Sequence, residues 1–321
     1  MIRVGIIGAD SPEAGELLRI LIHHPEVDIA CLYAPSMPGH RITSVHHGFI
    51  GEEDLFFSDK IDLSKIDALF LTDDSPLGDS IVERLHEWEN LKIINLSPSR
   101  FSDWSISDFE YGLSEVNRKP LVRGARNAIV PSPVASLVLV ALYPLASHLL
   151  LSSDIKASVK MPESLIETFN PSLTEIEIVR SLKKAQNSFE GKISFNISQS
   201  ASERSMRIGL ALKCPLGIDE ISKIYDSVYD DHNFTFISRE RIDDAEVEGT
   251  QKCLISVSKP GAGLLEIEIV ADGRLRGGAG DAVHALNLLF ALHEKVGLSL
   301  KPSVYSKTSG NSENTRTSWF A

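Results

Sequence analysis

The sequence predicts an α/β protein that combines a doubly wound parallel sheet with an α+β domain built on a mixed or antiparallel sheet. Two observations support this fold class. Residues 2–33 contain a strand pattern, a glycine turn, an amphipathic helix pattern and a second strand pattern, which is the order of a βαβ unit. From about residue 151 to residue 270, strand patterns alternate with long excursions, with helical patterns near residues 173–184 and 218–229.

Composition limits the function classes. The 321 residues have room for two domains, and 43% apolar content suits ordinary cores. A formal net charge of −12 opposes nucleic acid or an anionic membrane as partner. The apolar run at 134–151 is interrupted by polar residues, so we interpret it as a buried helix. The sequence contains three cysteines without CxxC spacing, Cys31, Cys214 and Cys253. This pattern indicates a reducing compartment, hence the cytoplasm, and no structural zinc.

The first turn is a candidate dinucleotide site. Gly5 and Gly8 close the first strand pattern, and Ser11 stands where a Rossmann fingerprint has its third glycine. Ser11 also suits the N-cap of the following helix. Ser36 and the nearby Arg41 follow the second strand, where NAD-binding chains have an acidic residue. If a dinucleotide binds at all, we therefore expect NADP.

Other residues of this turn oppose phosphate binding. Asp10 and Glu13 place carboxylates where a diphosphate would lie, and Pro12 removes one backbone N–H. The alternative interpretation is a glycine turn that serves only close packing of the strand on the helix.

A second glycine-rich approach precedes the helix pattern at 282–295. Arg276 and Gly278 could contact a phosphate or a nicotinamide amide there. A close crossing between two domains would need the same small residues. The histidine pairs 23–24 and 46–47 lack the spacing of a metal site, and we interpret them as surface or loop histidines.

The stretch 127–145, NAIVPSPVASLVLVALYPL, predicts a strand, a tight turn and a helix from about residue 135 towards 151. This arrangement places residues 132–134 at a helix N-terminus, where backbone N–H groups favour a developing anion. A nucleophile would suit this corner. The residue at the corner is Pro133, which has no nucleophilic atom.

A replacement nucleophile is not expected. Ser132 and Ser136 flank the corner, but a serine needs an adjacent base. The nearest histidine in the sequence is His148, about three turns along the same helix. The cysteines are expected in or beside strands, where a free cysteine usually acts as a small apolar residue.

Several segments carry a family resemblance in matching order and spacing: Gly5–Gly8, Glu16–Val27, Asp108–Arg118, Gly277–Asn287 and Val296–Pro302. With them the chain resembles N-acetyl-γ-glutamyl-phosphate reductases of the Bacteroidetes type, members of the semialdehyde dehydrogenase family. The resemblance implies a Rossmann domain of residues 1–133 and 282–305 and a central substrate and dimerisation domain of residues 134–281. Residues 306–321 are rich in Ser, Thr and Asn, and we expect a mobile tail.

The family chemistry implied by the resemblance needs a cysteine thiolate, hydride from NADPH and a histidine base. The alignment places Pro133 at the nucleophile position and Thr174 at the base position, within residues 172–178, which correspond to a His-x-His-x-Pro-Glu-Ile run. Arg204 takes the place of a substrate-binding arginine. The family's Ala-His-Gly is replaced by residues 73–75, Asp-Asp-Ser, and its Asp-x-Arg is displaced into residues 98–100, which end in Arg100.

The sequence therefore leads to a main hypothesis and an alternative. The main hypothesis is a reductase-like protein that has lost the covalent reaction and acts as a binding, regulatory or structural paralogue. We expect a homo-oligomer, a dimer or a tetramer, or a pairing with an active reductase. The alternative is an NADP-dependent oxidoreductase of arginine biosynthesis that reduces an acyl phosphate to a semialdehyde, or acts on another substrate.

Overall fold

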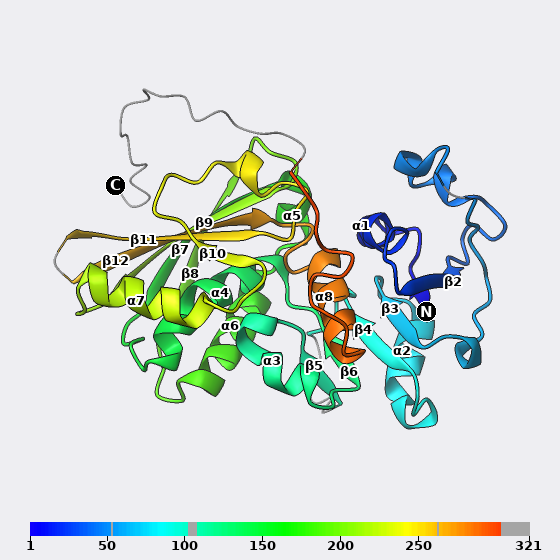
Figure 1. The fold of residues 1–321 in the computed structure, drawn as a ribbon, viewed down its shortest axis with the longest axis horizontal. Helices are drawn as coiled ribbons and strands as arrows, with labels where there is room; N and C mark the ends of the chain where they lie inside the picture. Colours follow the sequence, from blue (N-terminus) through cyan, green and yellow to red (C-terminus); the bar gives the residue numbers. More distant parts are fainter. Residues whose placement is uncertain (53, 102–107, 262, 303–321) are drawn as a thin grey trace. The chain divides into compact units, whose positions relative to one another are not determined.

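The computed structural model describes residues 1–52, 54–101, 108–261 and 263–302 (Figure 1). The chain divides into two compact units. The first contains Met1–Pro131 and Gly277–Ser299, and the second contains Ser132–Arg276 with the described residues that follow Ser299. The tail expected at 306–321 lies outside the described residues.

The first unit has a six-stranded parallel sheet in the order β2-β1-β3-β4-β6-β5. Its strands are β1 (Ile2–Ile7), β2 (Val27–Tyr33), β3 (Ala68–Leu71), β4 (Lys92–Asn95), β5 (Phe109–Tyr111) and β6 (Asn127–Ile129). Its helices are α1 (Pro12–Leu21), α2 (Pro76–Glu83), α3 (Ser114–Val122) and α8 (Ala279–Leu289), with short 3-10 turns η1 (Ile42–Ser44), η2 (His47–Phe49), η3 (Leu63–Lys65) and η4 (Leu85–Glu87). The parallel sheet confirms the predicted α/β class.

The beginning of the first unit forms as its local sequence predicts. The turn after β1 begins at Gly8, whose φ of +78° favours a residue without a side chain. Ser11 caps α1 by accepting a hydrogen bond from the N–H of Ala14 at 3.1 Å, and Pro12 stands in the first turn. These features set the position of the turn between β1 and α1.

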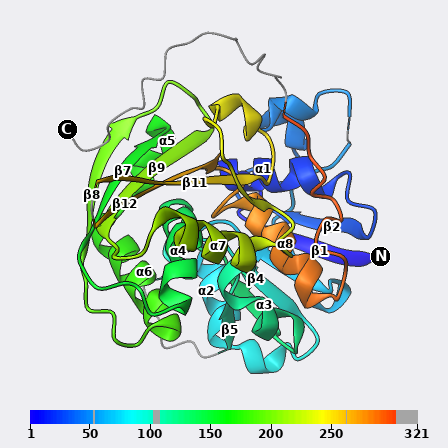
Figure 2. The same cartoon turned by 60° about the vertical axis from the view of Figure 1, so that its left-hand side comes forward.

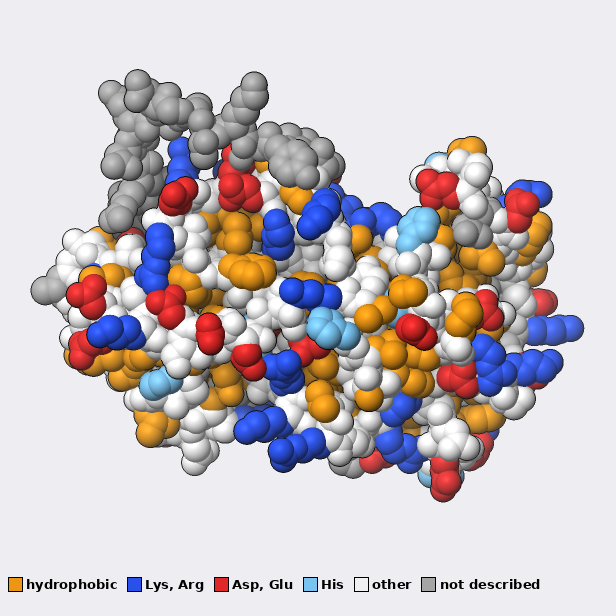
Figure 3. Space-filling model, in the orientation of Figure 1, with side chains coloured by type: hydrophobic (Ala, Val, Ile, Leu, Met, Phe, Trp, Pro, Cys, Tyr) orange, Lys and Arg blue, Asp and Glu red, His pale blue; other side chains and the backbone are white. Residues whose placement is uncertain are grey.

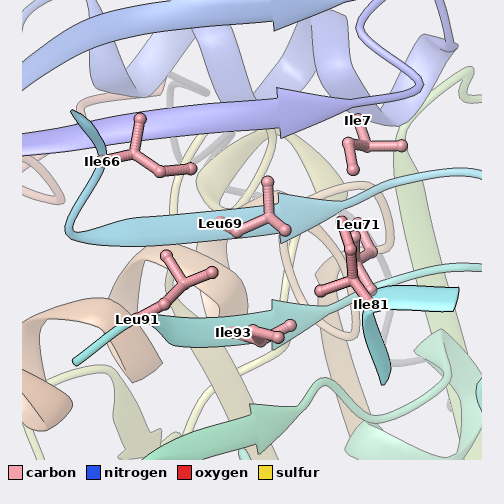
Figure 4. Packing of buried hydrophobic residues seen from close by; sticks show 7 residues of the cluster. All are labelled: Ile7, Ile66, Leu69, Leu71, Ile81, Leu91 and Ile93. Atoms are coloured by element: carbon pink, nitrogen blue, oxygen red, sulfur yellow. The ribbon is translucent and has the colours of Figure 1, made fainter. Parts of the chain in front are cut away.

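Apolar side chains from neighbouring strands fill one core of this unit, shown in Figure 4. Leu69 and Leu71 of β3 lie between Ile7 of β1 and Ile93 of β4, and Ile81 of α2 packs over them. Both faces of a parallel sheet are covered, so its strands are almost continuously apolar. The burial of both faces of the sheet explains why the strand segments of the first unit are almost continuously apolar.

Helix α8 returns to the first unit and packs against α1 and α3. The predicted helix at 282–295 is wrong in its bounds, because α8 already ends at Leu289. Ala291 has a φ of +54° and Gly297 a φ of +70°, and neither continues an α-helix. The turn therefore comes earlier than the apolar periodicity indicates.

His24 lies in the loop between α1 and β2, as interpreted from the sequence, but its side chain is buried rather than at the surface. Its Nε2 lies 3.0 Å from Oδ1 of Asn287 in α8, and its Nδ1 accepts the N–H of Glu26 at 3.3 Å. Both ring nitrogens have partners only in the neutral form, with the proton on Nε2. Burial accordingly lowers the pKa of His24.

The second unit has a six-stranded mixed sheet in the order β10-β11-β12-β9-β7-β8. Its strands are β7 (Ile155–Met161), β8 (Ile193–Gln199), β9 (Ser205–Lys213), β10 (Thr235–Ile237), β11 (Cys253–Gly261) and β12 (Leu264–Asp272). Its helices are α4 (Pro133–Ser147), α5 (Glu163–Thr168), α6 (Pro171–Ala185) and α7 (Ile218–Tyr229), with the turn η5 (Asp244–Glu246). Helices α4, α6 and α7 gather on one face of the sheet in both views (Figures 1 and 2), as expected for the α+β unit.

Helix α4 is the buried centre of this unit and packs against α6, α7 and the sheet. It ends at Ser147, one turn before the predicted end near residue 151. Pro144 lies inside it and cannot donate an N–H to the carbonyl of Val140. The hydroxyl of Tyr229 in α7 donates to that carbonyl instead, and Tyr225 donates to the carbonyl of Ala141 at 2.6 Å.

Candidate functional site

The corner at the start of α4 has the predicted strand, turn and helix. The backbone N–H of Val130 continues the sheet by donating to the carbonyl of Asn95 at 2.9 Å. Ser132 is the N-cap residue of α4, with φ −70° and ψ 152°, and Pro133 is the first helical residue. Both side chains are partly exposed. Pro133 stands at the position to which the resemblance assigns the nucleophile.

Arg100 holds the strand side of this corner within the first unit. Its guanidinium donates to the carbonyls of Val130 at 2.6 Å and Pro131 at 3.0 Å. It also donates to the carbonyls of Leu96 at 2.9 Å and Ser97 at 2.8 Å. Four backbone carbonyls therefore engage the guanidinium of the arginine that ends the displaced Asp-x-Arg run. Its evident role here is to fix the turn.

On the helix side, within the second unit, Ser132 is paired with Glu177 of α6. The backbone N–H of Ser132 donates to Oε1 at 3.0 Å, and the hydroxyl donates to Oε2 at 2.6 Å. Glu177 is only 1% exposed. Sequence reasoning missed this pair because the two residues are 45 positions apart. The available signal was the alignment, in which Glu177 matches the glutamate of the family's His-x-His-x-Pro-Glu-Ile run.

The positions aligned with the family's catalytic residues hold groups without that chemistry. Pro133 carries no nucleophile, and Thr174, a buried residue of α6 one turn before Glu177, has a hydroxyl that does not titrate near neutral pH. The cysteines do not compensate. Cys214 and Cys253 are buried in the second unit, whereas Cys31 lies on β2 of the first unit, where burial raises the pKa of its thiol.

The glycine turn of the first unit uses its own backbone donors. The N–H groups of Gly8 and Ala9 both donate to the carbonyl of Tyr33 at 3.1 Å. The N–H of Ser11 donates to the carbonyl of Gly8 at 2.9 Å, and its hydroxyl donates to Oγ1 of Thr72 at 3.0 Å. A phosphate cradle needs such N–H groups to point at the ligand. Here they point at the protein.

A carboxyl group also lies over this turn. A Cβ added to Gly8 would be 2.5 Å from Cγ of Asp73, whose residue follows β3 after Thr72. Oδ1 of Asp73 is buried and has no hydrogen-bond partner among the described residues. Burial raises the pKa of Asp73, and the nearby Asp10 and Asp74 raise it further. A diphosphate would meet this acidic group, so the residues present fit a dinucleotide diphosphate poorly.

The remaining cofactor candidates of the first unit have protein partners. Gly5 packs closely, since an added Cβ would be 2.9 Å from Cδ1 of Ile66. The hydroxyl of Ser36 donates to Oδ2 of Asp10 at 2.8 Å. Arg41 forms an ion pair with Asp54. Gly278 is the N-cap residue of α8, without a side chain to cap the helix. Gly8, Ser11 and Ser36 thus lie near the ends of β1 and β2, whereas Gly5 lies within β1.

The structure does not bring Arg276 into this group of residues. Its side chain is fully buried in the second unit, where the guanidinium donates to the carbonyl of Gln251 at 3.2 Å and to Oγ1 of Thr235 at 3.0 Å. Arg204, the substrate-binding candidate, forms an ion pair at 2.7 Å with the buried Asp272. Both arginines therefore stabilise loops at the ends of the mixed sheet.

The described residues contain no group of three or more His, Cys, Asp or Glu side chains that could hold a metal ion. Within the same residues, no helix is long and apolar enough to cross a membrane. On the face drawn in Figure 3, Lys and Arg side chains are interspersed with Asp and Glu. The expectation of no nucleic-acid partner stays a prediction.

Known proteins are similar to this chain in sequence. The family model described as semialdehyde dehydrogenase, NAD binding domain, matches residues 3–123. The N-acetyl-gamma-glutamyl-phosphate reductase of Phocaeicola vulgatus is 37% identical, over 95% of this chain and 100% of the relative. The reductase of the same name from Parabacteroides distasonis is also 37% identical, with the same coverage.

Solved structures show the same fold at low sequence identity. Aspartate semialdehyde dehydrogenase II from Vibrio cholerae has a TM-score of 0.68 and 15% identity, covering 91% of this chain and 98% of that chain. Aspartate semialdehyde dehydrogenase with NADP from Candida albicans has a TM-score of 0.68 and 12% identity, covering 92% and 99%.

Proposed function

Because the chain belongs to the N-acetyl-gamma-glutamyl-phosphate reductase family, we propose that it is a member that keeps the fold without the covalent reductase reaction. The observation that carries this proposal is Pro133 at the first position of α4. A thioester intermediate needs a thiolate at this corner, since it must displace phosphate and then accept hydride. A pyrrolidine ring cannot form that bond.

Several contacts support the same proposal. Thr174 replaces an imidazole that would titrate near neutral pH. Arg100 engages backbone carbonyls of the corner. Asp73 and the internally bonded turn at Gly8 oppose a diphosphate, so we propose that NADP binds weakly or not at all. A protein with these changes would serve as a binding, regulatory or structural paralogue in the cytoplasm.

The test measures reductase turnover directly. The purified protein is mixed with N-acetyl-γ-glutamyl phosphate and NADPH, and oxidation of NADPH is followed alongside the Phocaeicola vulgatus relative as positive control. We expect no oxidation above the protein-free reaction. Semialdehyde formation by the wild-type chain would overturn the proposal. The substitution Pro133→Cys should not restore full turnover, because position 174 still has a threonine in place of the histidine base.

We also propose that the protein is a homo-oligomer, or that it pairs with an active reductase when both are present. The resemblance supports this proposal, because its central domain is one used for dimerisation. Light scattering of the purified chain, alone and mixed with an active reductase, gives the assembly mass. A monomer under both conditions would contradict it.

A second candidate is an NADP-dependent oxidoreductase that reduces an acyl phosphate or acts on another substrate. The match of residues 3–123 to an NAD binding domain favours it. Fluorescence titration with NADPH separates the two candidates. A micromolar dissociation constant would favour the oxidoreductase, whereas no saturation in the millimolar range would favour the paralogue without reductase activity.

A further inference from the structure

The serine beside the lost nucleophile has an unusual partner. A serine at an N-cap usually accepts a hydrogen bond from an N–H group of the first helical turn. Ser132 makes no such bond in α4. Its hydroxyl instead donates to the carboxylate of Glu177 at 2.6 Å, which is short and typical of a charge-assisted hydrogen bond. The hydroxyl proton of Ser132 therefore points at Oε2 of Glu177, which can act as a base.

The base is held rigidly. Glu177 is 1% exposed and lies on α6, which packs against α4. Its second oxygen accepts the backbone N–H of Ser132 at 3.0 Å, so the carboxylate is aligned with the serine at two points. A nucleophile and an adjacent base, held against each other by two hydrogen bonds, are parts that nucleophilic catalysis requires.

The start of α4 supplies the electrostatics. The first N–H groups of a helix lack intrahelical partners and carry the positive end of the dipole. The side chain of Ser132 does not cap them. Pro133 has no N–H, so Val134 and Ala135 provide the first donors. These groups suit the negative charge that develops on a carbonyl oxygen during attack.

We propose that Ser132 and Glu177 form a nucleophile and base pair that hydrolyses acyl phosphates. The substrate class rests on the proposed function, since relatives of this chain are named for an acyl phosphate. Such mixed anhydrides have a good leaving group, so a carboxylate base suffices. No replacement nucleophile was expected from the sequence, because no histidine lies close to Ser132 along the chain. The folded chain places the base Glu177 beside it instead.

The reaction balances without a reductant. The hydroxyl proton of Ser132 passes to Oε2 of Glu177 while Oγ bonds to the acyl carbon. The carbon–oxygen bond to phosphate breaks, and phosphate leaves with the electron pair and takes the proton from Glu177, which becomes a carboxylate again. Water then attacks the serine ester and gives a proton to Glu177. Oγ of Ser132 leaves and recovers a proton from that carboxyl group. The products are a carboxylate and inorganic phosphate.

The first test measures phosphate release without any dinucleotide. Acetyl phosphate and N-acetyl-γ-glutamyl phosphate are the probes, and spontaneous hydrolysis is subtracted. We expect release by the wild type, and at least a 100-fold loss in both S132A and E177Q, on the order of the usual effect of a general base. E177Q still accepts the N–H of Ser132 but cannot take the proton. Ser147→Ala, at the exposed end of α4, is the control that keeps full activity.

The second test labels the serine directly. A fluorophosphonate probe should modify Ser132 in the wild type and not in E177Q, and peptide mass spectrometry identifies the site. Wild-type release no faster than spontaneous hydrolysis, equal release by E177Q, or labelling that leaves Ser132 unmodified would each overturn the proposal. Product analysis separates it from the proposed function, because hydrolysis yields a carboxylic acid without NADPH and a surviving reductase yields a semialdehyde only with NADPH.

Discussion

Asp73 is expected to destabilise the protein at neutral pH, so Asp73→Asn should raise the free energy of unfolding. Its Oδ1 is buried without a partner among the described residues, and Asp10 and Asp74 add repulsion. An unsatisfied buried polar group costs roughly 1–3 kcal/mol, and more when it is charged. Asp73 is only partly buried as a residue, so removing its charge should recover about 1 kcal/mol.

The pH dependence of this gain follows from the direction of the shift. The pKa of Asp73 is raised in the folded protein above its usual value of 3.8. At a pH below the usual pKa, the carboxyl group is neutral in the folded and the unfolded chain, and the free energy of unfolding is not reduced by its charge. As the pH rises through the folded-state pKa, the group becomes charged in the folded chain, and that part of the free energy of unfolding is lost. Urea unfolding of wild type and variant should therefore show a difference that shrinks on acidification.

The control is Asp74→Asn. Asp74 is exposed, and its Oδ1 accepts the backbone N–H of Ser99 at 2.9 Å and the hydroxyl at 2.7 Å. This variant should not be stabilised. The reasoning is refuted if Asp73→Asn unfolds more easily than the wild type at neutral pH, or if its gain is the same at every pH.

Three further predictions concern stability, each measured by urea unfolding. Because burial lowers the pKa of His24, stability should fall as the pH drops below about 6.5, a step that His24→Gln should remove. Arg100→Lys should cost roughly 1–3 kcal/mol, since an ammonium cannot reach the four carbonyls that the guanidinium joins; unchanged stability would contradict this role. Gly297→Ala should lose well over about 1 kcal/mol, because its Cβ would lie 2.3 Å from His24, and it should lose more than Gly39→Ala, where φ is also positive but nothing lies within 4 Å.

Local sequence chemistry predicted much of the fold. The cap at Ser11, the positive φ at Gly8 and the alternation of apolar runs depend on residues close together in the chain. The mixed sheet of the second unit was likewise predicted from strand patterns. Helix ends were less predictable. The apolar periodicity of α8 continues past Leu289, but the φ of Ala291 ends the helix, and no residue type marks that turn.

The candidate site was less predictable because its contacts join distant positions. The corner at Pro133 could be predicted from one stretch of sequence. The pairing of Ser132 with Glu177 depends on how α6 packs on α4, and the contacts of Arg100 depend on the path after β4. Arg276 looked like a ligand contact beside glycines, yet the packing of the mixed sheet buries it completely.

The proline inside α4 has an evolutionary consequence. Pro144 leaves the carbonyl of Val140 without its helical donor, and the hydroxyl of Tyr229 supplies one from another helix. The two residues are therefore epistatic: Tyr229→Phe should be harmful in this background and nearly harmless once Pro144 is replaced by alanine. A lineage that tolerates proline at this position would have acquired the tyrosine first, so related chains should contain both residues or lack the proline.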